Sequence, residues 1–204
     1  MMSSLRAELG ATDPDFVLQL PEGWVRMDAS DDSRDALLRQ ARDRLMRAHR
    51  PELYAHVRQS LLEAFEQLQR AGGAAVILPI GDVEGYVPAS LSAAFRSGRG
   101  GERLDDAVAG LIADGGTPLG DDRRFVRREA RDETTQDGQR LGVTTVHYLT
   151  PVPRTNRSRM LVLTAVMPHP VDAPDDEPLL VATRFLMDAM VATLRWRRPA
   201  GASA

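Results

Sequence analysis

The feature that most constrains the fold is a pair of strand-like runs joined at Gln136-Asp137-Gly138. Asp-Gly between two extended runs is a strong hairpin signal, because a tight turn needs residues that tolerate a positive φ. The run before it, residues 123–135, is rich in arginine, which predicts a place near a sheet edge. The run after it spans residues 138–152 and pairs with the first. Antiparallel hairpin order of this kind favours an α+β fold over a doubly wound βαβ sheet.

Other extended runs complete the predicted sheet. At the N-terminus, the turn Pro21-Glu22-Gly23 interrupts a run that starts at Phe16 and resumes at Trp24, which predicts a kinked strand or a two-strand corner. Residues 159–168 are apolar at consecutive positions, so we expect a central strand beneath helices. Two more runs of strand type occupy residues 74–80 and 87–95, the second with Leu91, Ala93 and Phe95 on one face.

Four segments show the spacing or the end signals of helices. Ser30 is a candidate N-cap of the first, with the apolar stripe Leu37, Leu38, Ala41, Leu45 and Ala48. Pro51 predicts the first position of a second helix, which Gly72-Gly73 closes; its stripe is Leu53, Val57, Leu61, Ala64 or Phe65, and Leu68. A short helix is expected within residues 103–116. The last helix is expected within 175–196, starting near Pro178, with the apolar face Leu179, Thr183, Leu186, Met190 and Leu194.

The order of these elements predicts one domain over residues 15–198, in which residues 31–71 form a helical insertion. Residues 1–14 are expected to be loosely ordered and residues 199–204 to form a flexible tail. The N-terminus lacks the apolar segment of a secretory signal, and no run approaches the length of a membrane span. These patterns predict a cytoplasmic protein without membrane insertion.

Composition narrows the function classes further. The chain has no cysteine, so disulfides, thiolate catalysis and cysteine zinc sites are excluded. Its net charge of −3 argues against a general nucleic-acid binder, which would carry a basic surplus. All 26 basic residues are arginine, a bias typical of a GC-rich genome, and together with the alanine content it favours an actinobacterial source.

The histidines and hydroxyl residues form no recognisable catalytic or metal motif. His49 and His56 lie seven residues apart on either side of Pro51, which does not fit the i, i+4 spacing of a helical metal pair. His147 is expected on a strand face, satisfied by a neighbouring hydroxyl or carbonyl, and His169 is expected in a loop. No G-x-S-x-G elbow surrounds any serine, and neither glycine-rich stretch matches a phosphate-binding loop. We therefore predict no catalytic residue, no metal and no cofactor.

Candidate interaction residues are Arg154, Arg157, Arg159 and Trp24. The three arginines lie in the segment 151–160, which should be a hairpin tip, and guanidinium groups there could contact an anion or an acidic partner. The alternative is a solvated hairpin that charge keeps soluble. Trp24 follows the first turn and is either a core plug or an exposed anchor.

Two segments near the ends of the chain, FVLQLPEGW and LLVATRFLMDAMVATLRW, carry a family resemblance. The first is similar to the opening strand, and the second to the terminal helix, of the PsbP-like superfamily. The resemblance implies an antiparallel sheet with helices on both faces, a PsbP-like α/β/α sandwich, here with an inserted N-terminal helical hairpin. Members include photosystem extrinsic subunits, a Ran-binding nucleotide-release factor and actinobacterial lipoproteins, which mostly bind partners. No functional residue carries over from the resemblance, and this chain lacks a lipoprotein cysteine.

The sequence thus predicts a non-enzymatic protein-interaction or accessory domain with an unknown protein partner, and leaves a homodimer open. The alternative is a carrier that holds a small apolar ligand between sheet and helices, which requires a pocket of at least about 300 Å³. A third alternative, a serine- or threonine-dependent hydrolase, requires a hydroxyl within hydrogen-bond reach of His147 or His169.

Overall fold

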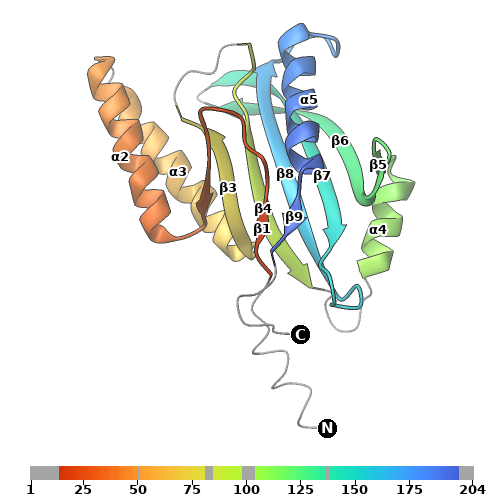
Figure 1. The fold of residues 1–204 in the computed structure, drawn as a ribbon. Helices are drawn as coiled ribbons and strands as arrows, with labels where there is room; N and C mark the ends of the chain where they lie inside the picture. Colours follow the sequence, from red (N-terminus) through yellow and green to blue (C-terminus); the bar gives the residue numbers. More distant parts are fainter. Residues whose placement is uncertain (1–13, 50, 81–84, 98–103, 137, 198–204) are drawn as a thin grey trace.

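A seven-stranded antiparallel sheet carries the fold, with helices packed against it (Figure 1). The computed structural model describes residues 14–49, 51–80, 85–97, 104–136 and 138–197. The order of strands across the sheet is β2 (Trp24–Asp28), β3 (Gly73–Pro79), β4 (Ser90–Ser97), β8 (Arg159–Pro170), β7 (Gln139–Pro151), β6 (Asp122–Gln136) and β5 (Thr117–Leu119). The predicted α+β class is confirmed, while the termini expected to be loosely ordered lie almost wholly outside the described residues.

The apolar strand β8 is the central strand of the sheet, as its sequence predicts. On one face Leu161, Leu163 and Ala165 are fully buried in the main core, together with residues of the helix α5 (Pro178–Ala192). Successive side chains of a strand point to opposite faces. Met160 and Val162 therefore point to the other face, where they join a smaller apolar cluster with the helix α4 (Leu104–Ala113).

The hairpin at Asp-Gly joins β6 to β7, with Gln136 paired to Gln139 and Gly138 at φ 75°. Asp137 itself lies outside the described residues. The arginine-rich strand β6 is the second strand from the edge, because Thr117–Leu119 forms the short strand β5 beside it. Sequence reasoning did not find β5, since three residues with a central proline give no periodicity.

The N-terminal turn separates two different sheets. Phe16–Val17 forms β1, which pairs with β9 (Arg195–Trp196) in a two-stranded ribbon, whereas Trp24 begins β2 of the large sheet. The amide of Trp24 donates to the carbonyl of Pro21 at 3.1 Å, and Gly23 adopts φ 78°. The rings of Phe16 and Trp196 meet edge to face at 6.3 Å, so β1 and β9 also contact each other through their side chains.

Two helices connect β2 to β3 and pack against each other beside the sheet (Figure 1). The first, α2 (Asp31–Arg47), begins at the predicted N-cap Ser30, whose hydroxyl accepts the amide of Ser33. The second, α3 (Glu52–Arg70), has Pro51 at its N-cap rather than at its first helical position. Among the described side chains of the predicted stripes, Leu37 and Phe65 are buried, so Phe65 rather than Ala64 faces the protein.

The helix α5 starts at Pro178 as predicted, and its core face includes the predicted Thr183 and Met190 but not Leu179. Its buried residues are Leu180, Thr183, Met187, Met190 and Val191. Leu179, expected in the core, is 45% exposed, and Leu194 and Trp196 follow the helix rather than continuing it. No helix in the described ranges is long and apolar enough to cross a membrane.

Candidate binding pocket

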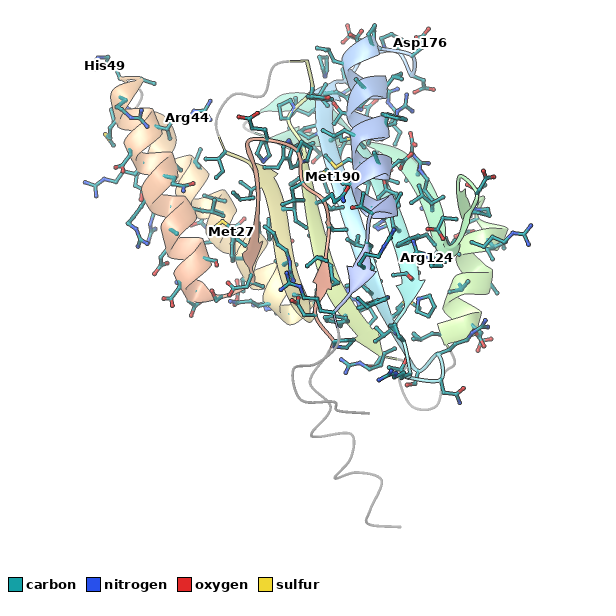
Figure 2. All side chains as sticks on the ribbon, in the orientation of Figure 1. Met27, Arg44, His49, Arg124, Asp176 and Met190 are labelled. Carbon is teal, nitrogen blue, oxygen red and sulfur yellow. The ribbon has the colours of Figure 1, made fainter. Side chains whose placement is uncertain are left out.

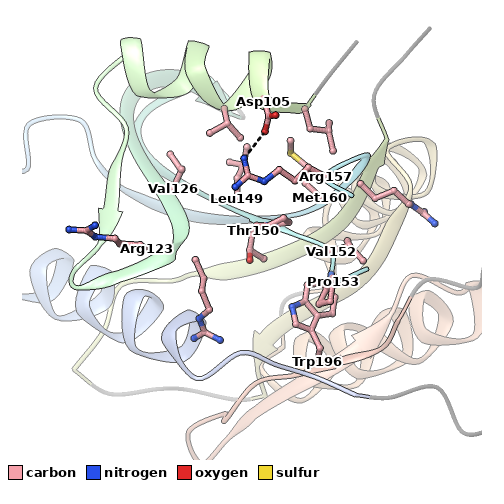
Figure 3. A pocket seen from close by; sticks show the side chains of 15 residues that line it. Asp105, Arg123, Val126, Leu149, Thr150, Val152, Pro153, Arg157, Met160 and Trp196 are labelled. Carbon is pink, nitrogen blue, oxygen red and sulfur yellow. Dashed lines mark hydrogen bonds and ion pairs between the residues drawn. The ribbon is translucent and has the colours of Figure 1, made fainter. Parts of the chain in front are cut away.

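A cavity of about 420 Å³ opens at the end of the sheet where β7 turns into β8. The helix α4 forms one wall, the start of β6 forms a second, and Trp196 of β9 closes the side opposite α4 (Figure 3). Short loops at β5–β6 and β7–β8 hold these walls in place. The cavity therefore combines four segments that are distant in the sequence.

The inner surface of this pocket is mostly apolar. Leu149 and Met160 come from the two neighbouring central strands, and Leu104 and Val108 from one side of α4. Val126, Val152 and Pro153 complete the apolar lining. A hydrocarbon or aromatic group placed here would be removed from water, which stabilises binding by about 25 cal/mol per Å² of apolar surface.

Guanidinium groups dominate the polar part of the lining, which holds Arg123, Arg124, Arg157, Arg159 and a single carboxylate, Asp105. Arg157 reaches across to Asp105 at 3.3 Å (Figure 3), an exposed ion pair of small energetic weight. Arg124 is bound to Asp122, and its hydrogen bonds hold the pKa of that carboxyl below its ordinary value. Arg123 forms no ion pair with any residue that the structure describes. The surplus of positive charge favours an anionic group at the rim.

The connection between β7 and β8 has an unusual backbone. Arg154, Asn156 and Arg157 all adopt a positive φ, between 49° and 64°. Such conformations cost free energy for residues other than glycine and persist where the surroundings fix them. The hydroxyl of Thr155 donates to the carbonyl of Val152 at 2.8 Å, and the amide of Val152 donates to the carbonyl of Arg159 at 3.0 Å. The loop is thus a defined structure that presents its arginines from fixed positions.

The structure brings two of the four candidate interaction residues to this pocket. Arg157 stands at the rim, and Arg159 lies partly over the ring of Phe95 at 5.9 Å while it lines the cavity. Arg154 is exposed on the same loop but is not part of the lining. Trp24 is remote from it, in the main core with 7% of its surface exposed, and its indole Nε1 meets no acceptor among the described residues.

Sequence reasoning missed Arg123, Arg124 and Trp196 as lining residues. The sequence pattern assigns the two arginines to a charged strand and the tryptophan to the end of a helix. A signal was present in the alternation of β6, where Val126 and Arg124 share a face, but the strand periodicity does not reveal that α4 closes over them.

The charged residues nearest the core form a network of hydrogen bonds between α5 and the sheet. The phenol of Tyr148 donates to Asp188 at 2.6 Å, and Arg127 donates to the same carboxylate at 2.9 Å. Arg127 and Arg184 both bind Glu129. Burial raises the pKa of Tyr148, and the neighbouring carboxylate raises it further. This network fastens α5 to β6 and β7, and none of its members lines the pocket.

Both histidines singled out as catalytic candidates contact a threonine hydroxyl. His147 Nδ1 lies 3.1 Å from Thr164 Oγ1, which satisfies the ring as expected, and burial together with Arg128 lowers its pKa. His169 is part of β8 rather than a loop; it is 4% exposed, lies 3.1 Å from the hydroxyl of Thr144 and 2.8 Å from the carbonyl of Pro170. The minimum geometry of the hydrolase alternative is therefore present. Thr144 is itself buried, however, and the third group on His169 is a backbone carbonyl.

Metal-binding geometry is absent from the described part of the chain, where no group of three or more histidine, aspartate or glutamate residues could hold an ion. The glycine-rich stretch between β4 and α4 lies mostly outside the described residues, as does the side chain of His56.

Comparisons with known proteins give little. No family model matches the chain, and no curated protein matches it. A crystal structure from Bacteroides thetaiotaomicron VPI-5482, determined at 1.50 Å resolution, is similar with a TM-score of 0.41 and 10% sequence identity. The match covers 90% of this chain and 46% of that chain, so this chain spans about half the length of the solved one.

Proposed function

We propose that the chain is a non-catalytic interaction or accessory domain whose pocket receives an apolar, acidic segment of a partner protein. The observation that supports this is the pocket itself, an apolar cavity of about 420 Å³ with four arginines and one carboxylate in its lining. An apolar side chain fills the interior while a neighbouring carboxylate meets the guanidinium groups. Arginine suits this role because its planar fork binds carboxylates in a bidentate manner.

The fixed loop between β7 and β8 supports the same function. Its backbone holds Arg154 and Arg157 in conformations that an arginine rarely adopts. A loop whose backbone is already ordered loses less conformational freedom on binding than a mobile loop does. A carboxylate of the partner segment would replace Asp105 at Arg157 or bind beside it, since that ion pair is long and exposed.

A second candidate function is a carrier for a small amphipathic anion. Its specific support is the size of the cavity and its place between the sheet and α4, because small-molecule sites have volumes of about 300–1,000 Å³. Both functions require arginines that bind an anionic group at the pocket. They differ in whether that group belongs to a partner protein or to a small molecule.

Our proposal for the fold family rests on the resemblance of the segments near the two ends of the chain. We infer a PsbP-like sandwich in which α2 and α3 form the inserted hairpin, on the grounds that α5 and α4 contribute to apolar clusters on opposite faces of the sheet. Partner binding is the usual role in that group, and an interaction domain is consistent with it.

Site-specific photocrosslinking in the native host tests this function. A benzoyl-phenylalanine at Pro153, exposed at the pocket, should form a covalent adduct with one protein, whereas the same group at Arg39 on α2 should not. The double reversal Arg123→Glu and Arg157→Glu should remove the adduct, and the matched reversal Arg39→Glu should leave it.

Three results are informative. A protein adduct that depends on Arg123 and Arg157 supports the interaction domain. An adduct with the mass of a small molecule at Pro153 contradicts it and favours the carrier. Adducts at Pro153 that match those at Arg39 contradict both functions, because the pocket would then have no preferred occupant.

A further inference from the structure

The outer face of α5 is apolar along its whole length. The exposed side chains of this helix are Pro178, Leu179, Val181, Phe185, Ala189 and Ala192. Phe185 is 74% exposed, the most exposed large apolar side chain among the described residues. The two charged residues, Arg184 and Asp188, are turned toward the sheet and engaged in ion pairs. The water-facing side of α5 therefore carries no charge.

This arrangement departs from the usual pattern of a surface helix, in which polar residues occupy the face opposite the core. A helix that is apolar all round is normally covered on all sides. We define the α5 face as the exposed residues Val181, Phe185, Ala189 and Ala192.

Charges of opposite sign mark the two ends of the α5 face. Asp175, Asp176 and Glu177 directly precede the helix, and Asp176 stands at its N-terminal end in Figure 2. Arg195 and Arg197 follow its C-terminal end and are exposed. Trp196 packs against Phe16 and Phe95, whereas Arg195 is exposed and its charge also acts on Asp122 at the start of β6.

We propose that the α5 face is a homodimer interface, in which two copies of this chain pack their α5 helices antiparallel about a two-fold axis. We infer a second copy as the occupant because Asp176 and Glu177 at one end of the helix and Arg195 at the other are self-complementary in that arrangement, while Asp175 and Arg197 already pair with Arg131 and Asp15. The acidic end of each helix then lies beside the basic end of the other, whereas a parallel pairing would place like charges together. An isologous contact of this kind is the commonest form of oligomer.

The sizes of the side chains fit the same arrangement. An axis that crosses the helix between Phe185 and Ala189 places each Phe185 over the Ala189 of the partner, and Val181 near the partner's Ala192. A large side chain thus meets a small one along the stripe, which lets the helices approach to the usual distance of about 8–10 Å. This interface lies on the opposite side of the sheet from the α4 cluster and does not depend on the pocket.

Sedimentation velocity on the full chain, from about 1 to 100 μM, tests the interface. The parent chain should sediment increasingly as a dimer over this range. Phe185→Asp should weaken association at least about tenfold, because it places two carboxylates in the apolar centre of the contact. Ile112→Asp alters an exposed large apolar residue on α4, outside the α5 face, and should leave association unchanged. Circular dichroism should show both variants folded.

Charge exchange provides a stricter test. Asp176→Arg alone and Arg195→Asp alone should each weaken the dimer several-fold, and the double variant should recover most of the loss. The helix between these residues is about 22 Å long, so the recovery cannot come from a contact within one chain. A monomer throughout the concentration range, a dimer that Phe185→Asp leaves intact, or a double variant weaker than either single one would each overturn the proposal.

Discussion

Removal of the Tyr148 hydroxyl tests how α5 is fastened to the sheet. Tyr148 is fully buried, and its phenol donates to Asp188 at 2.6 Å. Tyr148→Phe leaves Asp188 with its hydrogen bonds from Arg127, so the carboxylate keeps a charged partner. The expected cost is that of one hydrogen bond to a charged group, about 1.5–3 kcal/mol.

Asp188→Ala is the more damaging change in the same network. It leaves both the Tyr148 hydroxyl and one side of the Arg127 guanidinium without an acceptor, and Arg127 keeps only Glu129 among its present partners. Breaking a buried pair by removing one member costs about 3–5 kcal/mol, and we expect the lower end because the Asp188 side chain is 29% exposed. The double variant should cost less than the sum of the single ones by about 1 kcal/mol or more, since both changes break the same bond.

Urea unfolding followed by circular dichroism measures these differences, with an unchanged slope as the sign that both states keep their compactness. A Tyr148→Phe variant as stable as the parent would refute the reasoning. The same holds if Asp188→Ala costs less than Tyr148→Phe, or if the two changes are additive.

Three further predictions concern the core, the sheet and the pH dependence of stability. Trp24→Ala should lower the free energy of unfolding by about 3–5 kcal/mol, because a large buried ring is lost; a near-neutral result would mean that the ring contributes outside the core. Gly142→Ala should cost about 1–3 kcal/mol, because a Cβ there would lie 2.3 Å from the buried ring of His169, and thermal unfolding should show a lower Tm. For Glu129, burial alone would raise the pKa, but hydrogen bonds from two arginines lower it below the usual 4.5. The Glu129 carboxylate therefore stabilises the fold fully above about pH 4.5, and this contribution is lost as the pH falls through the lower pKa of the folded state. Glu129→Gln should make the free energy of unfolding less dependent on pH in acid. An unchanged dependence on pH would contradict this.

Local chemistry in the sequence was sufficient for several elements. The Asp-Gly signal placed the β6–β7 hairpin, and Ser30 marked the start of α2, since turns and caps depend on a few neighbouring residues. The uninterrupted apolar character of β8 placed it at the centre of the sheet, because such a strand needs cover on both faces.

The face of α5 could be predicted from its periodicity only in part. The helix is apolar all round, so several faces have the same spacing; Thr183 and Met190 were on the predicted face, but contact with the sheet selected Leu180 over Leu179. The outer face that remains is the one for which we propose a second copy. The pocket could not be predicted from the sequence either, because α4, β6 and β9 come together only in the folded structure. The sequence identified Arg154, Arg157 and Arg159 by their charge, but it did not predict the cavity beside them.

Binding of an amphipathic anion to the pocket tests the central claim most directly. The probe is 1-anilinonaphthalene-8-sulfonate, whose aromatic body suits the apolar interior and whose sulfonate suits the arginine rim. Its fluorescence should rise to saturation with one probe per chain. The double variant Arg123→Glu and Arg157→Glu should bind it about tenfold or more weakly, while Phe185→Asp, which alters the separate apolar face on α5, should bind it as the parent does. Binding that Phe185→Asp abolishes and the arginine reversals leave unchanged would contradict the account, because the apolar face of α5 would then be the site in place of the pocket.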